Sequence, residues 1–354
     1  MKLKVGNITK IRTGKLDANA SSPDGKYPFF TCSKNPLKIS TYSYDCECVL
    51  VAGNGDLNVK YYNGKFDAYQ RTYIIEDNSN GLLYMPYLYY FFEGYIEKLR
   101  KQSIGGVIKY IKLGNLTNAL IELPSIEEQK YIVSLINISS ELIDLRRETI
   151  NKLDSLVKAR FIEMFGDPVS NSKHLPLKTL PQLGTFGRGV SKYRPRNAPE
   201  LLNGPYPLIQ TGDIANSELY IKNYNSTYSE VGLKQSKMWD KGTLCITIAA
   251  NIAKTAILQF DACFPDSVVG FNGNNFTNNI FIYYWFSFFQ EILENQAPES
   301  AQKNINLKIL SELQIITPDI IEQNKFVHFV RHVDKSRFDI KKSIIELERE
   351  VVYD

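Results

Sequence analysis

The sequence predicts an α+β protein: two mixed α/β domains separated by two long antiparallel coiled-coil helices, in a pseudo-twofold tandem repeat. The first observation is length, because 354 residues are enough for two hydrophobic cores. The second is a joint of strand, proline and helix that occurs twice. The third is a pair of long segments with apolar residues every seven positions, as in coiled coils. We therefore expect a globular domain over 1–125, a helix over 126–168, a second globular domain over 169–318 and a helix over 319–354.

The repeated joint connects each globular domain to its helix. Ala119–Val133 reads ALIELPSIEEQKYIV, and Glu312–Val327 reads ELQIITPDIIEQNKFV. Both run from an apolar strand through a proline and an acidic turn to Glu-Gln and an apolar helix. Pro124 and Pro318 lie 194 residues apart, and the Glu-Gln pairs keep the same offset. The globular domains match each other poorly, so the two copies share a scaffold and differ in their heads.

The first domain is predicted from short strands and one amphipathic helix. The strand-like runs Cys48–Gly53 and Arg71–Glu76 are bounded by Gly and Asn turns, and Tyr87–Lys101 has a helical pattern. Residues 1–125 contain 16 Lys and Arg against 11 Asp and Glu. Such an excess permits nucleic-acid binding without requiring it.

The first long helix is predicted to begin at a capping box and to end at a glycine. Ser125 and Glu128 have the spacing that satisfies the first free backbone N–H groups of a helix. No Gly or Pro follows until Gly166, and about 40 residues make a helix of roughly 60 Å. Ser139 and Arg146 interrupt one row of its heptads. The predicted seam consists of Ile136, Ile143, Ile150 and Val157.

The second half of the chain repeats this order. Strand-like runs over Thr243–Ala250 and Ser267–Phe271 and an aromatic helix over Phe281–Glu294 predict the second domain. After Pro318, Asp319-Ile320-Ile321-Glu322 rebuilds the capping box. Arg337 interrupts one heptad row of the helix that follows. The predicted seam of this helix consists of Phe326, Val333, Ile340 and Leu347.

The two seams are predicted to bury each other. A single heptad helix cannot cover its own apolar stripe. Antiparallel pairing would place the two domains at opposite ends of a spacer. The alternative is that each helix packs on its own domain, but both helices exceed the width of a domain.

Composition indicates a globular protein of a reducing compartment. No run of about 18 apolar residues occurs, and the N-terminal MKLKVGNITKI lacks the apolar core of a signal peptide. Five cysteines without a regular framework are typical of a reducing environment. We expect a cytoplasmic protein.

The sequence predicts no catalytic or metal site. His328 and His332 have a spacing that can hold zinc, but no third ligand is visible, and surface or seam histidines are the simpler interpretation. Gly53-Asn54-Gly55 lacks the third glycine of a dinucleotide site and is interpreted as a hairpin turn. The Walker A, nucleophile-elbow and amino-methyltransferase signatures are absent from the sequence. The cysteines Cys32, Cys46 and Cys48 form no CxxC pair and are interpreted as ordinary buried cysteines.

The remaining chemistry is that of polar, basic and aromatic loops suited to DNA. Arg and Lys bind phosphate or guanine, and Asn and Gln pair with adenine. For each candidate alone, a charged surface loop is the more common explanation. The exception is Gly187–Asn197, GRGVSKYRPRN, where glycines and basic residues alternate in a segment expected to be exposed. The candidates in the first domain are Thr13, Lys15, Lys34, Lys60, Tyr62, Gln70, Arg71, Lys101 and Gln102. Those in the second domain are Arg188, Lys192, Tyr193, Arg194, Arg196, Gln210, Thr211, Gln302, Lys303 and Asn304.

Over nearly its whole length the chain resembles the specificity subunits of type I restriction–modification systems. The most specific parts are the joints LPSIEEQKYIV and TPDIIEQNKFV. KARFIEMFGDP, at the end of the first helix, is similar to the central conserved region of that family. YPLIQTGDI and ACFPDSVVGF look like strands of its target recognition domains.

The resemblance implies a role in addressing DNA rather than in chemistry. Each domain would be a target recognition domain that reads one half of a bipartite site in double-stranded DNA. The paired helices would set the half-site spacing and recruit two modification subunits, which carry S-adenosylmethionine and methylate adenine. Restriction subunits, with ATP and Mg, would join through them. This chain would be non-catalytic and hold no cofactor.

One departure from the family and two competing functions stay open at this point. The second helix has no counterpart of RFIEMFGDP, so partner docking or closure of the repeat would be weaker here. The alternative function is a stand-alone two-headed DNA-binding or regulatory protein that is not assembled with a methyltransferase. A third is an enzyme with small-molecule clefts between domains and helices, which the missing motifs disfavour.

Overall fold

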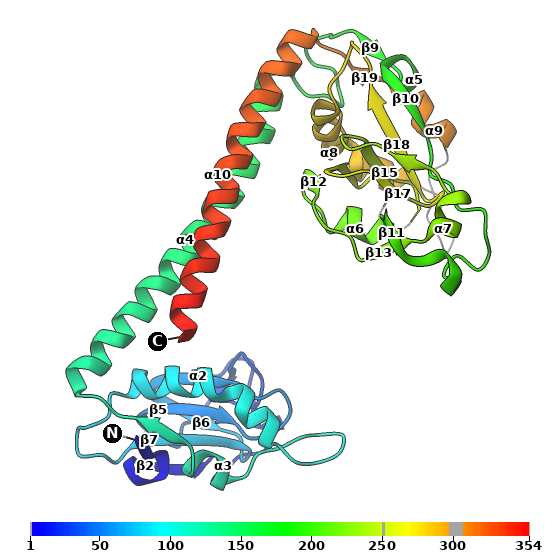
Figure 1. The fold of residues 1–354 in the computed structure, drawn as a ribbon. Helices are drawn as coiled ribbons and strands as arrows, with labels where there is room; N and C mark the ends of the chain where they lie inside the picture. Colours follow the sequence, from blue (N-terminus) through cyan, green and yellow to red (C-terminus); the bar gives the residue numbers. More distant parts are fainter. Residues whose placement is uncertain (1, 250–251, 297–306, 354) are drawn as a thin grey trace. The chain divides into compact units, whose positions relative to one another are not determined.

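The computed structural model contains β-sheets with helices packed around them and two long helices (Figure 1). It describes residues 2–249, 252–296 and 307–353. The predicted fold class is confirmed. The chain divides into two compact units: residues 1–146 with 343–354, and residues 147–342. The long helices α4, Ile126–Phe165, and α10, Ile320–Tyr353, each contribute to both units. No helix among the described residues combines the length and apolarity needed to cross a bilayer.

The first unit is built on a six-stranded sheet with the order β2-β7-β5-β6-β3-β4. Its strands are β2 Thr9–Thr13, β3 Tyr27–Phe30, β4 Leu37–Ile39, β5 Tyr44–Ala52, β6 Val59–Ala68 and β7 Thr72–Asp77. Around it lie β1 Lys2–Lys4, α1 Val5–Ile8, η1 Ala18–Ala20, α2 Met85–Gln102, α3 Leu113–Thr117 and β8 Leu120–Glu122. Strand β1 pairs antiparallel with β8, which ties the start of the chain to the first joint.

The central strand β5 shows how the two faces of this sheet are filled. Val49 and Val51 pack with Leu88 and Phe92 of α2 on one face, while Leu50 belongs to the apolar cluster on the other. This alternation follows from the two-residue period of a strand. The strand begins at Tyr44, four residues before the predicted start. The sequence did not indicate this first half, because the acids in it lower its strand propensity.

The second unit contains a five-stranded sheet, β10-β18-β15-β16-β12, and a four-stranded sheet, β13-β11-β17-β14. The strands of the larger sheet are β10 Gly184–Arg188, β12 Tyr220–Ile221, β15 Leu244–Thr247, β16 Thr255–Leu258 and β18 Val268–Gly273. Those of the smaller are β11 Leu202–Leu208, β13 Ser226–Tyr228, β14 Met238–Trp239 and β17 Ala262–Cys263. A further pair, β9 Leu177–Lys178 with β19 Ile315–Ile316, repeats the β1–β8 pair at the second joint.

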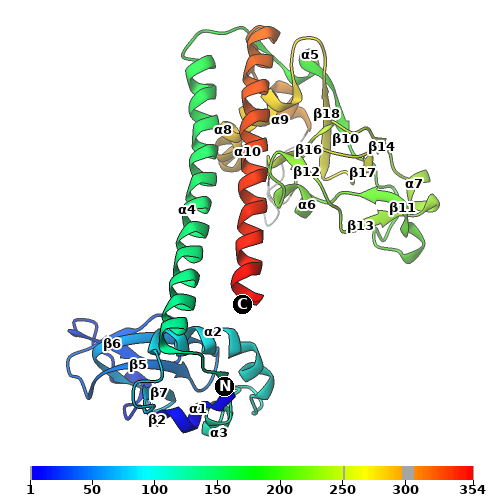
Figure 2. The same ribbon diagram turned by 60° about the vertical axis from the view of Figure 1, so that its left-hand side comes forward.

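Short helices connect these strands, and one long aromatic helix fills the core. The short helices are α5 Leu180–Leu183, η2 Pro199–Leu201, α6 Thr211–Ala215, α7 Glu230–Lys234 and α9 Leu307–Glu312. The aromatic helix α8, Asn279–Gln296, confirms the helix predicted over Phe281–Glu294. Its Phe281 stacks on Phe161 of α4 at 5.3 Å between ring centroids. The core of the second unit therefore includes the end of α4 as well as the head (Figure 2).

Within the second unit, α4 and α10 pack side by side and run antiparallel. The Phe161 ring lies 5.4 Å from that of Phe326, and Asp154 forms an ion pair with Arg337. Residue numbers thus fall along α4 as they rise along α10, which makes the pair antiparallel. In the first unit, Arg146 donates to the Ser343 carbonyl at 3.0 Å. Mutual pairing of the two helices is confirmed.

The predicted seam residues differ in burial. Ile143, Val157, Phe326 and Val333 are buried, and Ile136, Ile150, Ile340 and Leu347 are half-buried. Arg146 and Arg337, which looked like interruptions in the heptads, each bond across the helix pair.

The first capping box is confirmed and the second is wrong in part. The Ser125 backbone N–H donates to the Glu128 carboxylate at 2.9 Å, and the Glu128 N–H donates to the Ser125 hydroxyl at 3.3 Å. At α10 the Asp319 carboxylate accepts from the Ile321 N–H at 2.7 Å. Glu322 instead pairs with Lys325 at 2.6 Å, because the lysine three positions on offers a charged partner.

Candidate nucleic-acid interface

A buried glutamine fixes the start of α4 to the first head. The Gln129 side-chain oxygen accepts from the Tyr84 backbone N–H at 2.8 Å, immediately before α2. Its amide nitrogen donates to the carbonyls of Leu82 at 2.8 Å and Pro124 at 3.0 Å. The side-chain oxygen and both amide hydrogens are therefore bonded inside the protein, and Gln129 is fully buried.

The second joint repeats this arrangement around Gln323. Its side-chain oxygen accepts from the Thr277 hydroxyl at 3.0 Å and the Asn278 N–H at 3.1 Å, before α8. Its amide nitrogen donates to the carbonyls of Phe276 and Pro318, both at 2.9 Å. The repeated Glu-Gln of the sequence is thus a repeated attachment of head to helix.

In the first head, the structure brings four predicted DNA contacts to one turn of the sheet. The Gly14 N–H donates to the Thr72 carbonyl at 3.0 Å and the Lys15 N–H to the Ala68 carbonyl at 3.2 Å. The end of β2 therefore lies against the turn between β6 and β7. The residues gathered there are Thr13, Lys15, Gln70 and Arg71, and all four are exposed.

The other candidates of the first head are dispersed. Lys34 is exposed, and Lys60 is half-buried beside Asn58, where burial lowers the pKa of its amine. Tyr62 is half-buried, with its ring 5.7 Å from that of Phe66. Lys101 and Gln102 are exposed at the end of α2.

In the second head, the segment Gly187–Asn197 is held by bonds to Gln235 and Asp266, which lie elsewhere in the same head. The backbone N–H groups of Lys192 and Tyr193 both donate to the Gln235 side-chain oxygen, at 2.7 and 3.1 Å. Arg194 and Arg196 share the carboxylate of Asp266, at 3.7 and 2.6 Å. Asp266 therefore partly neutralises the charge of these two arginines.

The remaining candidates of the second head lie elsewhere. Arg188 is exposed at the end of β10. Gln210 and Thr211 begin α6, where the Gln210 N–H donates to the Asp213 carboxylate at 2.8 Å. The predicted contacts Gln302, Lys303 and Asn304 lie outside the described residues.

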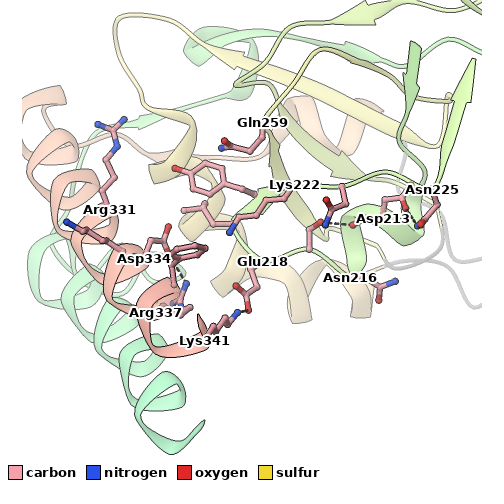
Figure 3. Close-up of a pocket in the computed structure, with 16 residues that line it drawn as sticks. Asp213, Asn216, Glu218, Lys222, Asn225, Gln259, Arg331, Asp334, Arg337 and Lys341 are labelled. Atoms are coloured by element: carbon pink, nitrogen blue, oxygen red, sulfur yellow. Dashed lines mark hydrogen bonds and ion pairs between the residues drawn. The ribbon is translucent and has the colours of Figure 1, made fainter. Parts of the chain in front are cut away.

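A polar groove of about 810 Å³ opens in the second unit between the head and α10 (Figure 3). The head supplies the segment from Asp213 to Asn225 and Gln259, and α10 supplies residues from Arg331 to Lys341. None of the DNA contacts predicted from the sequence lies in its wall, although Gln210 and Thr211 lie three and two residues before Asp213. The groove brings together two distant segments of the head and one helix, so no contiguous motif could have revealed it.

A network of ion pairs forms one end of this groove. Arg337 is only 7% exposed and binds Asp154 of α4 and Asp334, the latter at 2.7 Å. Burial works to lower the pKa of the Arg337 guanidinium, but the carboxylates of Asp154 and Asp334 outweigh it and raise that pKa. Lys341 pairs with Glu218 of the head. The network therefore connects both long helices and the head within the second unit.

A family model for the type I restriction modification DNA specificity domain matches residues 1–155 and 179–349. The chain belongs to this family of specificity subunits. The specificity subunit of the Escherichia coli EcoDI type I restriction enzyme is 26% identical over 373 residues, covering 97% of this chain and 83% of the relative.

Solved structures share the fold of this specificity subunit. The S subunit of a type I system from M. genitalium has a TM-score of 0.62 at 15% identity, covering 99% of this chain and 93% of that one. A structure from work on complex assembly and conformational transition of the type I R-M system has a TM-score of 0.67 at 16% identity, covering 99% and 95%. At these identities the structures establish the fold alone.

The fold of the specificity subunit also gathers an aromatic and basic cluster that was not predicted. In the first head, the rings of Tyr27 and Tyr42 lie 4.9 Å apart. Lys26 lies over Tyr27 at 5.8 Å, and Lys65 over Tyr42 at 4.8 Å. Tyr42 is exposed and Tyr27 is half-buried. Such cations can bind phosphate, and an exposed tyrosine ring can stack on a base. The four residues come from three separate parts of the sequence, so no contiguous motif indicated the cluster.

Proposed function

We propose that this chain is the DNA-recognition subunit of a type I restriction–modification complex. Each head reads one half of a bipartite site in double-stranded DNA, and the paired helices set the distance between the half-sites. The observation that carries this proposal is the antiparallel pairing of α4 and α10, with the same glutamine attachment at the start of each. A stiff helix pair can fix an integral number of base pairs.

The same proposal assigns no chemistry to this chain. Two modification subunits with S-adenosylmethionine methylate adenine, restriction subunits with ATP and Mg join through them, and the complex works in the cytoplasm. An exposed apolar stripe on the first half of α4 supports docking of a modification subunit. It consists of Tyr131, Leu135, Ile138 and Leu145, which are 45–63% exposed. Their steps of four, three and seven residues are those of a helix that packs against another helix.

The decisive experiment is to map methylated adenines in DNA from cells that carry this chain with its modification subunit. The expected result is one bipartite motif with an unspecified middle of fixed length, lost when the chain is deleted. A continuous motif, or unchanged methylation after deletion, contradicts the proposal. Purification without any methyltransferase would instead favour a stand-alone DNA-binding protein.

A further inference from the structure

The groove between the second head and α10 holds more positive charge than its carboxylates neutralise. Arg337 and Lys341 are used in ion pairs with Asp154, Asp334 and Glu218. Three other cations of the wall have no carboxylate within 4.0 Å among the described residues. They are Lys222 on the head and Arg331 and Lys335 on α10.

The remaining carboxylate of the wall, that of Asp213 on the head, accepts hydrogen bonds from its own surroundings. Asp213 accepts from the Gln210 N–H at 2.8 Å and from the Asn225 side-chain amide at 2.8 Å. Its oxygens therefore serve the local fold of α6. These bonds come from neutral groups and leave the negative charge of Asp213 in place. The wall contains five cations and three carboxylates, and the excess of positive charge comes from α10.

The two cations on α10 lie on one face of the helix. Arg331 and Lys335 are four residues apart, and side chains at this spacing lie one above the other. The opposite side of the groove carries the exposed amides of Asn216, Asn223 and Gln259. Cations with neutral amides are the groups that bind a phosphodiester backbone and neighbouring base edges.

The composition of the wall argues against a small-molecule pocket. Such pockets are lined mainly by apolar and aromatic side chains. Here Leu219, Tyr220 and Phe338 are the apolar or aromatic residues among the 16 that line the groove. Lys222 lies 5.8 Å from the Phe338 ring centroid, so even this ring is shared with a cation.

We propose that this groove binds the phosphodiester backbone of DNA beside the second half-site. Arg331 and Lys335 contact phosphates from α10, and Lys222 contacts them from the head. The inference rests on the proposed function and extends it, because α10 then binds DNA directly besides setting a spacing. Phosphate contacts fix position without reading sequence. The contacts therefore add affinity at this site and leave the recognised half-sequence unchanged.

The test compares two double variants in the complete complex with modification subunits. Arg331→Gln with Lys335→Gln removes both groove charges from α10. Lys325→Gln with Arg349→Gln removes two charges from α10 outside the groove. Affinity for a duplex containing the mapped motif is measured from about 0.05 to 0.3 M salt, the range in which counterion release dominates. Gel filtration of each complex, without DNA, measures its content of modification subunits.

We expect the groove variant to bind DNA roughly 10–100-fold more weakly and to lose about two from the slope of log K against log salt. The control pair should stay within about twofold of the parent. Lys222→Gln should weaken binding in the same way by about one phosphate contact. The motif that is methylated should not change in any variant.

Two outcomes would overturn the inference. Unchanged affinity and salt slope in the groove variant would show that the groove does not contact DNA. Loss of modification subunits with normal DNA affinity per assembled complex would show that the groove holds an acidic surface of a partner protein. Failure of the proposed function is distinct, because then the parent complex itself would show no bipartite motif.

Discussion

At the scale of residues, the charge available to DNA differs from the charge written in the sequence. The basic segment Gly187–Asn197 contains the most concentrated positive charge, yet Arg194 and Arg196 share Asp266. Lys222, Arg331 and Lys335 were not among the predicted DNA contacts, yet they have no carboxylate partner among the described residues. Proximity in space, and not in sequence, decides which cations remain for a ligand.

Asp266 gives a direct test of this segment as a DNA contact. Replacing Arg194 and Arg196 with Ala should weaken binding at the second half-site by about tenfold and leave the first half-site unaffected. Asp266→Asn should have the opposite effect, since it frees both guanidinium groups, and should steepen the salt dependence. Electrophoretic mobility shifts on duplexes with one half-site altered would measure both. Equal affinities for all three proteins would exclude this segment from the interface.

The Glu218–Lys341 pair predicts a pH dependence of stability. Burial alone would raise the pKa of Glu218, but the Lys341 ammonium, helped by Arg337 and Lys222, outweighs burial and lowers it from 4.5. A carboxyl with a lowered pKa in the folded state stabilises the fold above its unfolded pKa, and this contribution disappears as pH falls through the folded pKa. Glu218→Gln should therefore lose less stability than the parent between about pH 5 and pH 3.

Thermal unfolding across that range measures the effect, with Glu312→Gln as an exposed control on α9. Parallel curves for Glu218→Gln and the parent would mean that the pair contributes no pH-dependent stability. Only the difference between the two curves is informative, because other carboxyls titrate in both proteins.

At the scale of elements, helices were predicted better than strands. Both long helices end within three residues of the predicted bounds because local signals mark them: a capping box at Ser125 and a glycine at Gly166. Two-residue strands such as β12 and β17 have no signal of their own, since they exist only through pairing with longer strands. The predicted contacts were contiguous motifs, whereas the groove combines segments more than 100 residues apart.

The buried glutamines make a prediction for the joints. Gln129→Leu leaves the Tyr84 N–H and the carbonyls of Leu82 and Pro124 without their partner, and Gln323→Leu does the same at the second joint. Since buried unpaired groups cost about 1–3 kcal/mol each, we expect each variant to lose at least about 2 kcal/mol. Urea unfolding measures this loss.

Matched controls are the exposed neighbours of the two glutamines, Glu127→Gln and Asn324→Ala. These should change the free energy of unfolding by less than about 0.5 kcal/mol. Gln129→Glu separates shape from bonding, because a carboxylate cannot donate to the two carbonyls. Full stability in that variant would contradict the importance of the donated bonds.

At the scale of the whole molecule, one scaffold is used twice with different heads. The joint, the glutamine attachment and the pairing of a short N-terminal strand with the strand before the joint occur in both units. The sheets differ: one has six strands, while the other unit divides its strands into sheets of five and four. The proposed function uses both facts, since spacing and sequence preference can then change independently.

The spacing role predicts the effect of lengthening the helices. Seven residues inserted after Arg146, with seven matching residues inserted before Ser343, keep the heptads in phase. Seven residues add roughly 10 Å of helix, or about three base pairs of duplex. We expect the unspecified middle of the methylated motif to lengthen by that amount while both half-sequences stay the same. An unchanged middle, or altered half-sequences, would contradict the spacing role.

The aromatic end of α4 has a practical consequence for dissecting this protein. Phe161 and Phe165 are buried beside Phe281 and Phe326, so the interior of the second unit is closed by residues on both sides of the globular segment 169–318. A fragment cut at those borders would expose this aromatic surface to water and aggregate. An expression clone of the second unit should instead span about Arg147 to Lys342, so that it carries the segments of both long helices that close its core.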